Sequence, residues 1–247
     1  MQQLRHHAIP ALPSGSCQIW WAHTSAARPA LLDLLDEHER GRHDRFVRAQ
    51  DRALFVVSHA LARIIASRHV ASMPRAIRYS RSSIAPGHKP RLAGGASELE
   101  LSISHSGQRA VVAVSRGVAL GVDVELVSPV AAEQPPIRSV LDESEQRELG
   151  TMPAAMRPWG FCRYWTRKEA VLKATGDGLS VLPELITVAP PSESPALTRW
   201  SGPRRPQPPI HLYDLDAEPG YTASLAAIGD ELEVSEHDGS AILRGWR

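Results

Sequence analysis

Apolar residues alternate with polar ones in several short stretches of the 247-residue chain. This spacing predicts a strand at 17–23 and consecutive strands across 98–127, with turns at 106–107 and 116–117. The stretch 77–92 predicts two further strands, joined by a Pro-Gly turn. The expected strands of the first half therefore lie on both sides of a long helical region.

Apolar residues recur at helical spacing in two regions. The first runs from 30 to 69, with Gly41 as the expected break between a shorter and a longer helix. The second is WTRKEAVLKATGDGL at 165–179, which is expected to end at its two glycines. Before it, Asp142 and Glu145 are spaced as a capping box, which predicts the start of a short helix.

The last quarter of the chain has weaker patterns. A strand is expected at 184–189, and strand-like runs occur at 210–216, 221–229 and 241–247. The stretch 190–209 is rich in proline and serine, which predicts a surface loop.

The order of these elements repeats loosely, because each half has a strand, a long helix and further strands. This pattern predicts an α+β fold of two similar halves, 1–117 and 118–247, with a ligand between them.

Composition restricts the class of protein. Hydrophobic residues make up 43% and charged residues 22%, as in ordinary globular chains. The net charge is +1, from 28 basic and 27 acidic residues, so no nucleic acid or membrane partner is expected. No apolar run is long enough to span a membrane, and the N-terminus has no apolar signal region. Two cysteines cannot form a secreted disulfide framework, and we expect reduced thiols and a cytoplasmic location.

The sequence GVDVE at 121–125 offers a candidate metal site. Residues two apart in a strand face the same side, so Asp123 and Glu125 present two carboxylates together. Oxygen ligands of this kind suit Mg²⁺, which also takes substrate phosphates. The alternative interpretation is a solvent-facing acidic edge.

Lysine is rare in this chain, since three of its 28 basic residues are lysine. On the second long helix Trp165, Glu169 and Lys173 share a face, and Lys168 can line the same pocket from its edge. A compact ammonium suits phosphate contact and proton transfer better than the fixed fork of arginine. The alternative is a surface helix with an ion pair worth about 0.3 kcal/mol.

Two turns carry further candidates. Ser104 and His105 in SISHSG could bind phosphate oxygens or only make local hydrogen bonds; no G-x-S-x-G elbow supports a hydrolase. In GHKP, Lys89 lies on an expected turn, where it either binds an anion or is an exposed hairpin lysine.

These motifs occur in one order: GHKP, SISHSG, GVDVE and W-x-x-K-E-A-x-x-K. All three lysines lie inside them. The set resembles the 4'-phosphopantetheinyl transferases of the monomeric Sfp type, with the signatures G-[IV]-D-[IVL]-E and [WF]-x-x-K-E-[AS]-x-x-K. The resemblance covers about residues 40 to 180. The form of the helix motif that has Trp and Lys-Glu-Ala (W/KEA) is the variant associated with secondary-metabolite and lipid synthases.

The resemblance implies a monomeric pseudo-dimer. Each half is a small, mainly antiparallel sheet packed against a long helix, and the active site lies in the cleft between the halves. The implied reaction moves the phosphopantetheine arm of coenzyme A to a serine of an apo acyl or peptidyl carrier protein and releases adenosine 3',5'-bisphosphate. Mg²⁺ is required, with Mn²⁺ open as an alternative; the carrier, whether of fatty-acid, polyketide or nonribosomal-peptide synthesis, is also open.

The resemblance also implies residue roles. Asp123, Glu125 and Glu169 match the metal ligands. Lys173 matches a lysine that contacts the pyrophosphate and can protonate the leaving group, and Glu169 is the candidate for deprotonating the serine, directly or through a bound water. His105 would help to stabilise charge on the phosphoryl oxygens.

Other positions match coenzyme A contacts. Ser104 and His105 match residues that bind its phosphates, Lys89 a turn lysine near the nucleotide, and Lys168 a motif lysine of less defined role. Arg42 matches a residue that binds the 3'-phosphate. Its rivals nearby are Arg40, Arg45, Arg48 and Arg52.

The sequence leaves two alternative functions. One is a non-catalytic module of the same fold that binds coenzyme A or a carrier protein. The presence of every expected carboxylate argues against this alternative. The other is a different Mg²⁺-dependent phosphotransferase, which would need a phosphate loop of the type G-x-x-x-x-G-K-[ST]; the sequence has no match.

Overall fold

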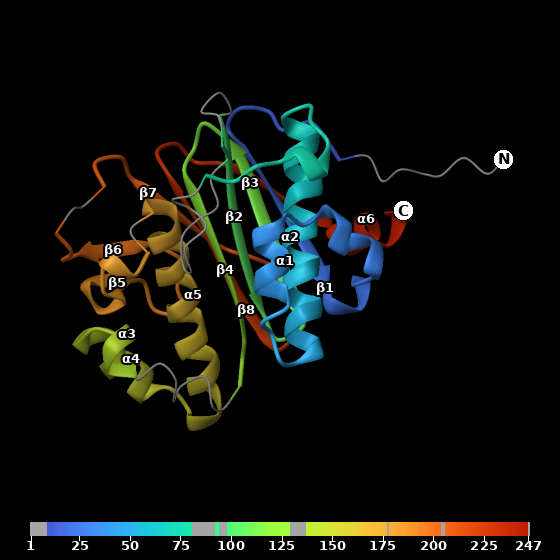
Figure 1. Ribbon diagram of the computed structural model, residues 1–247. Coiled ribbons are helices and arrows are strands. Elements are labelled where there is room, and N and C mark those ends of the chain that lie inside the picture. Colours follow the sequence, from blue (N-terminus) through green and yellow to red (C-terminus); the bar gives the residue numbers. More distant parts are fainter. Residues whose placement is uncertain are drawn as a thin grey trace. The chain divides into compact units, whose positions relative to one another are not determined.

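The structure is a computed structural model that describes residues 9–80, 92–93, 98–128, 137–176, 178–203 and 206–246 (Figure 1). The chain forms two compact units. The first contains the described residues up to Gly117 together with those from Glu233 onwards, and the second contains Val118–Leu232. No helix in the described part of the chain is long and apolar enough to cross a membrane.

A four-stranded sheet in the order β2-β3-β1-β9 forms the first unit. Its strands are β1 Ser16–His23, β2 Leu99–Ser106, β3 Arg109–Arg116 and β9 Glu233–Asp238. Neighbours pair antiparallel except β1 and β9, which are parallel. The sheet is therefore mainly antiparallel, as expected, and its last strand comes from the end of the chain.

The long helix α2, Ala49–His69, packs on this sheet. Its buried residues include Phe55, Leu61 and Ile65, which share one hydrophobic core with Val112 and Val114 of β3. From Leu54 to Ser67 every residue except His59 is buried, so the helix is enclosed on most of its sides and not along a single face.

The break before α2 lies later than expected. Helix α1 is Glu37–His43, and Gly41 lies inside it rather than between two helices. Asp36 and Glu39 cap its start in a reciprocal capping box. The chain leaves helical structure only at 44–48, so the prediction of a break at Gly41 was wrong by a few residues.

The second unit contains two small sheets. One has the order β4-β8-β7, and the other pairs β5 with β6. The strands are β4 Leu120–Leu126, β5 Ile186–Val188, β6 Leu197–Trp200, β7 Ile210–Asp214 and β8 Tyr221–Ile228. The helices are α3 Ile137–Val140, α4 Glu143–Thr151 and α5 Arg157–Thr175.

Helix α5 packs along β4 and β8 and ends at Gly176, whose φ of 76° is left-handed. The left-handed end confirms the predicted stop, since glycine adopts this conformation at little cost. The capping box of Asp142 and Glu145 at the start of α4 is also confirmed. Each unit thus has one long helix packed on a sheet, and the second unit also has the small β5–β6 sheet; this is the α+β arrangement inferred from the repeat (Figure 1).

Short 3₁₀ turns connect these elements. They are η1 Thr24–Ala26, η2 Pro29–Leu34, η3 Pro74–Ala76, η6 Ala154–Met156, η7 Gly178–Ser180 and η8 Pro183–Leu185.

Three expectations about the later chain need correction. The proline-rich stretch 190–209 contains β6, which pairs with β5, so this stretch is not wholly a loop. Of the run expected at 241–247, residues 241–245 lie in a helix, α6 Gly239–Gly245, rather than in a strand. Because β9 and α6 complete the first unit, the second unit ends at Leu232 instead of at the end of the chain.

Most of the hairpin expected at 77–92 lies outside the described residues. The structure places a single antiparallel bridge between Tyr79 and Leu92. This pairing agrees with the direction of the expected hairpin.

The glycine of GVDVE allows α5 to lie directly on β4. A methyl group at Gly121 would come within 2.2 Å of the carbonyl oxygen of Ala170 and 2.4 Å of the amide nitrogen of Ala174. Both contacts are to backbone atoms, which cannot move aside as a flexible side chain can. Any larger residue would therefore separate the helix from the strand.

Gly121→Ala is expected to lower the free energy of unfolding of the second unit by about 3 kcal/mol, because overpacking a close backbone contact must displace α5. Urea unfolding followed by circular dichroism measures this loss. Gly150→Ala is the matched control: it lies on α4 with no atom within 4 Å of the added methyl, and alanine there should stabilise the helix by about 0.5–1 kcal/mol. Equal stability of the two variants would contradict the tight packing.

Candidate active site on β4 and α5

Strand β4 places the two carboxylates of GVDVE on one side. Asp123 pairs in register with Ser224 of β8, and Glu125 pairs with Thr222. Asp123 is 3% exposed, whereas Glu125 is partly exposed near the end of the strand. A carboxylate as buried as Asp123 requires a compensating partner.

Helix α5 supplies that partner. The Nζ of Lys173 lies 2.7 Å from Oδ1 of Asp123 and donates a second hydrogen bond to the carbonyl oxygen of Val122 at 3.2 Å. Two turns earlier on the helix, Nε1 of Trp165 donates to Oε1 of Glu125 at 3.3 Å. The ends of the predicted face of α5 thus both contact β4, and Glu169 lies between them on the helix.

The charges around Glu169 and Lys173 raise the pKa values of both side chains. Burial, together with the charge of Asp123, raises the pKa of Glu169 to about 7, although Lys173 opposes this rise. Burial alone would lower the pKa of Lys173, but the charges of Asp123 and Glu169 outweigh it and raise that pKa. The site therefore holds a firmly charged ammonium beside a carboxyl group that titrates near neutrality, a combination suited to acid–base chemistry.

The fit of these residues to a metal is partial. Among the described residues no group of three or more His, Cys, Asp or Glu side chains is arranged to hold a metal ion. Asp123 and Glu169 nevertheless lie close enough for one charge to raise the pKa of the other carboxyl group. Mg²⁺ in phosphate-transfer sites usually takes one or two carboxylates, with water and substrate phosphates completing its coordination. The donor types fit Mg²⁺, and the three-carboxylate ligand set stays a prediction.

Lys168 does not lie where the sequence placed it. Its side chain is fully buried, and its Nζ contacts the carboxylate of Glu145 on α4 and the carbonyl oxygens of Val140 and Pro183. The expectation that Lys168 lines the same pocket and binds coenzyme A is therefore corrected. Helical spacing alone could not predict the burial of Lys168, because its hydrogen-bond acceptors come from other segments of the chain.

Arg167 is a second buried cation that the sequence did not single out. It is 0% exposed and forms a bidentate pair with Asp214 of β7, at 2.7 and 3.1 Å. Its other N–H groups donate to the carbonyl oxygens of Ala189, Pro190 and Glu193. In the sequence, an arginine within a helical motif has the character of a surface residue. No sequence pattern therefore predicted that Arg167 is buried.

Two candidates of the first unit, Ser104 and His105, lie near the end of β2. Ser104 is buried and His105 exposed near the end of β2. Nε2 of Gln50, at the start of α2, donates to the carbonyl oxygen of Gly107 at 3.0 Å. The SISHSG turn therefore lies beside the segment that follows the arginine-rich stretch 40–48.

The arginines of this stretch differ in their contacts. Arg42 lies over the ring of Phe55, with 5.4 Å between the guanidinium carbon and the ring centroid. Arg40 and Arg52 each donate to backbone carbonyl oxygens nearby. These contacts leave Arg42 with Arg45 and Arg48 as the better candidates for phosphate. Lys89 lies outside the described residues.

Comparisons with known proteins agree with these motifs. Residues 119–226 match the model of the 4'-phosphopantetheinyl transferase superfamily, and residues 20–117 match a model of the N-terminal part of 4'-phosphopantetheinyl transferases. The 4'-phosphopantetheinyl transferase HetI of Nostoc is 27% identical over 236 residues, which are 92% of this chain and 95% of that protein. The 4'-phosphopantetheinyl transferase AcpT of Salmonella typhimurium is 27% identical over 134 residues, 51% of this chain and 66% of that protein.

The two family matches adjoin and together span the β4–α5 site and the SISHSG turn. The chain belongs to the 4'-phosphopantetheinyl transferase family.

Proposed function

We propose that this protein transfers the 4'-phosphopantetheine arm of coenzyme A to a serine hydroxyl of an apo acyl or peptidyl carrier protein. The serine oxygen forms a bond to the phosphorus that carries the arm, and the bond from that phosphorus to adenosine 3',5'-bisphosphate breaks. The observation that carries the proposal is the Lys173–Asp123 pair beside Glu169, whose pKa is near 7, within the segment that matches the family.

Glu169 is the group proposed to accept the serine proton, directly or through a bound water. A base works best when its pKa lies near the operating pH, and burial with the charge of Asp123 brings Glu169 there. Lys173 is the proposed contact to the pyrophosphate and the donor of a proton to the departing bisphosphate. Its short pair with Asp123 holds the ammonium in one place and keeps it charged.

Mg²⁺ is the proposed metal, and Asp123, Glu125 and Glu169 are the residues that would hold it. When bound, Mg²⁺ neutralises charge on phosphoryl oxygens. The repulsion that raises the pKa of Glu169 supports this choice, because a cation near both carboxylates would relieve it.

Ser104, His105 and Arg42 are proposed to bind the phosphates of coenzyme A, including the 3'-phosphate. Their support is the hydrogen bond from Gln50, which follows the arginine-rich stretch, to Gly107 of the SISHSG turn, and the position of Arg42 over the ring of Phe55 on α2. The W/KEA form of the helix motif supports a carrier from secondary-metabolite or lipid synthesis and the Sfp type of enzyme. The buried, unpaired thiols of Cys17 and Cys162 are compatible with the cytoplasm as the place of action.

Mass spectrometry of an apo carrier protein tests the proposal. Incubation with this protein, coenzyme A and Mg²⁺ is expected to add the mass of one phosphopantetheine to the carrier and to release adenosine 3',5'-bisphosphate in equal amount. Removing divalent metal with EDTA should stop the reaction, and Mg²⁺ or Mn²⁺ should restore it. A carrier whose acceptor serine is replaced by alanine is the control.

Several unrelated carriers are needed, because the partner is not identified. An unchanged mass for all of them would overturn the proposal. Coenzyme A binding measured by calorimetry, without transfer to any carrier, would point instead to a non-catalytic binding module.

A further inference from the structure

Lys168 has a complete set of acceptors in the interior of the second unit. Its side chain is 0% exposed, and the Nζ donates to the carbonyl oxygen of Val140 at 2.7 Å, to that of Pro183 at 3.1 Å and to the Glu145 carboxylate. An ammonium has three N–H groups, so these three acceptors satisfy it fully. Lys168 cannot reach a ligand without giving up these bonds.

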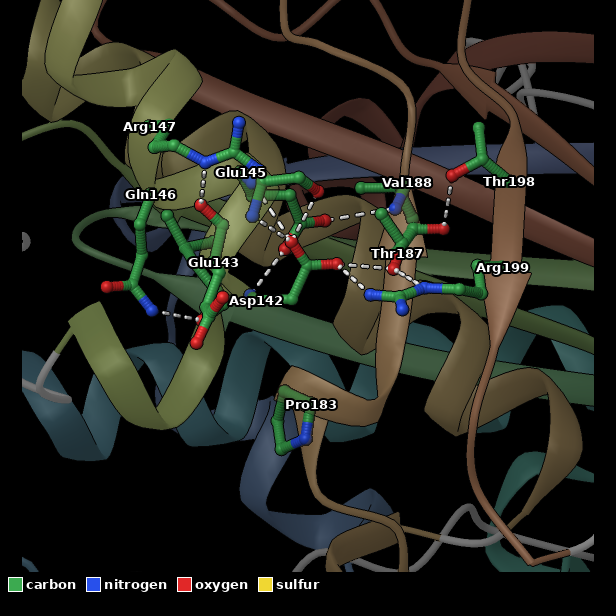
Figure 2. A network of polar contacts seen from close by, with 12 residues as sticks. Asp142, Glu143, Glu145, Gln146, Arg147, Pro183, Thr187, Val188, Thr198 and Arg199 are labelled. Carbon is green, nitrogen blue, oxygen red and sulfur yellow. Dashed lines mark hydrogen bonds and ion pairs between the residues drawn. The ribbon is translucent and has the colours of Figure 1, made fainter.

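Glu145 extends these contacts to other segments. Its Oε2 also accepts from the backbone N–H of Asp142 at 2.9 Å, and its Oε1 accepts from that of Val188 at 3.0 Å. Asp142 in turn accepts from Thr187 and, at 2.9 Å, from Arg199. Figure 2 shows these carboxylates between α4 and the strands that carry Thr187 and Arg199.

The network therefore joins α5 to four other elements of the second unit. Through Lys168 the helix is tied to the end of α3, to α4 and to η8, and through Glu145 also to β5. Lys168 directly precedes Glu169, whereas Lys173 contacts β4 one turn further along. The position of Lys168 fixes how far α5 is rotated about its axis, and this rotation decides which side chains face β4.

We propose that Lys168 is a positioning residue of the transfer reaction: its buried pair with Glu145 holds α5 in the rotation that presents Glu169 and Lys173 to β4. The inference rests on the proposed function. It also gives the chain a reason to keep lysine at this position, because the five N–H groups of arginine would exceed the acceptors present and need more room.

The test compares Lys168→Met, Glu145→Gln and the double variant Lys168→Met/Glu145→Gln with the unmodified protein. Methionine has a similar shape without charge, so Lys168→Met leaves the Glu145 carboxylate buried without its cation. Glutamine at 145 removes that charge and keeps one acceptor oxygen, enough for one of the two backbone N–H groups that donate to the Glu145 carboxylate. Arg147→Met, on the exposed face of α4, is the control for loss of one positive charge.

Lys168→Met is expected to lower kcat at least tenfold, to change KM for coenzyme A less than twofold and to lower the unfolding temperature. The double variant should regain most of the unfolding temperature and bring kcat to within about threefold of the unmodified protein, because the unpaired charge is gone. Arg147→Met should behave as the unmodified protein does.

A higher KM for coenzyme A with unchanged kcat and unfolding temperature would show a ligand contact and overturn the proposal. Regained stability without regained kcat would also overturn it, because the ammonium itself would then be required. Hydrogen exchange gives a readout that needs no activity: in Lys168→Met the amides of 169–175 should exchange at least tenfold faster than in Arg147→Met. Equal exchange overturns the inference even if no carrier is modified, whereas a failure of transfer by the unmodified protein counts only against the proposed function.

Discussion

Glu169→Gln is expected to lower kcat for phosphopantetheine transfer by about 10²–10⁴-fold, the usual loss when a positioned general base is removed. Glutamine has nearly the same shape but cannot accept the serine proton, and it is a poorer ligand for a divalent cation. Transfer measured as the rate of carrier mass increase, under saturating coenzyme A, checks this result.

The same variant should be more stable in metal-free buffer at neutral and alkaline pH. The pKa of Glu169 is about 7 in the folded protein against an ordinary 4.5, so the folded state binds the proton more tightly than the unfolded state. The contribution of Glu169 to the free energy of unfolding is therefore fully present below about pH 4.5, and it is lost as the pH rises through 7. Above pH 7 glutamine removes a penalty of up to about 3 kcal/mol, since each pKa unit corresponds to about 1.4 kcal/mol.

Unfolding temperatures between pH 4.5 and 8.5 measure this difference. The two proteins should converge at low pH and diverge as the pH rises, and added Mg²⁺ should stabilise the unmodified protein more than the variant. Glu148→Gln, an exposed position on α4, is the matched control for the lost charge and should change neither activity nor the pH dependence. If Glu169→Gln kept full activity, Glu169 would be neither base nor ligand.

Ending the chain at Leu232 is expected to unfold the first unit. The truncation removes β9 and α6, including Leu243, which is fully buried in the core of that unit. Trp20 loses its ring contact with His237, whose centroid lies 4.5 Å away, and the neighbouring strand β1 loses its parallel partner. We expect a loss of more than about 5 kcal/mol, which is comparable to the whole stability of a small domain.

Circular dichroism and urea unfolding of the truncated chain check this prediction. Leu243→Ala in the full chain is the graded control, with an expected loss of about 2–5 kcal/mol for a buried leucine. A synthetic peptide of 233–247 should restore the signal of the truncated chain, since the strand adds to an existing sheet edge. A truncated chain that unfolded at the same urea concentration as the full chain would show that β9 and α6 contribute little.

The elements that the sequence predicted well are those with strong local signals. Apolar and polar residues alternate in β2 and β4, whereas β3 is a short apolar run between two turns, and α2 has a long stretch rich in apolar residues that is buried on most of its sides. Periodicity predicted that Asp123 and Glu125 share one side of a strand and that Glu169 and Lys173 share one face of a helix. The direct ion pair of Lys173 with Asp123 was not predicted, because periodicity does not place the helix against the strand.

What the sequence did not predict depends on distant partners. Lys168 and Arg167 have the same character in sequence as exposed cations, and only Glu145 and Asp214, from other segments, allow their burial. Strand β9 has an exposed and polar pattern, because it lies at the edge of its sheet and gains its register from β1. The short β6 lies in a proline-rich stretch and exists through its pairing with β5.

The parallel pairing of β1 with β9 bears on how the chain folds during its synthesis. Strand β9 follows all of Val118–Leu232 in the sequence, so β1 is synthesised long before the strand that pairs with it. The second unit has all its strands once Leu232 has emerged and can fold before the first is complete, although it is synthesised later. Until β9 has emerged, β1 keeps an open edge beside Trp20 and Trp21, and this nascent edge is where aggregation on the ribosome or binding by a chaperone is expected to begin.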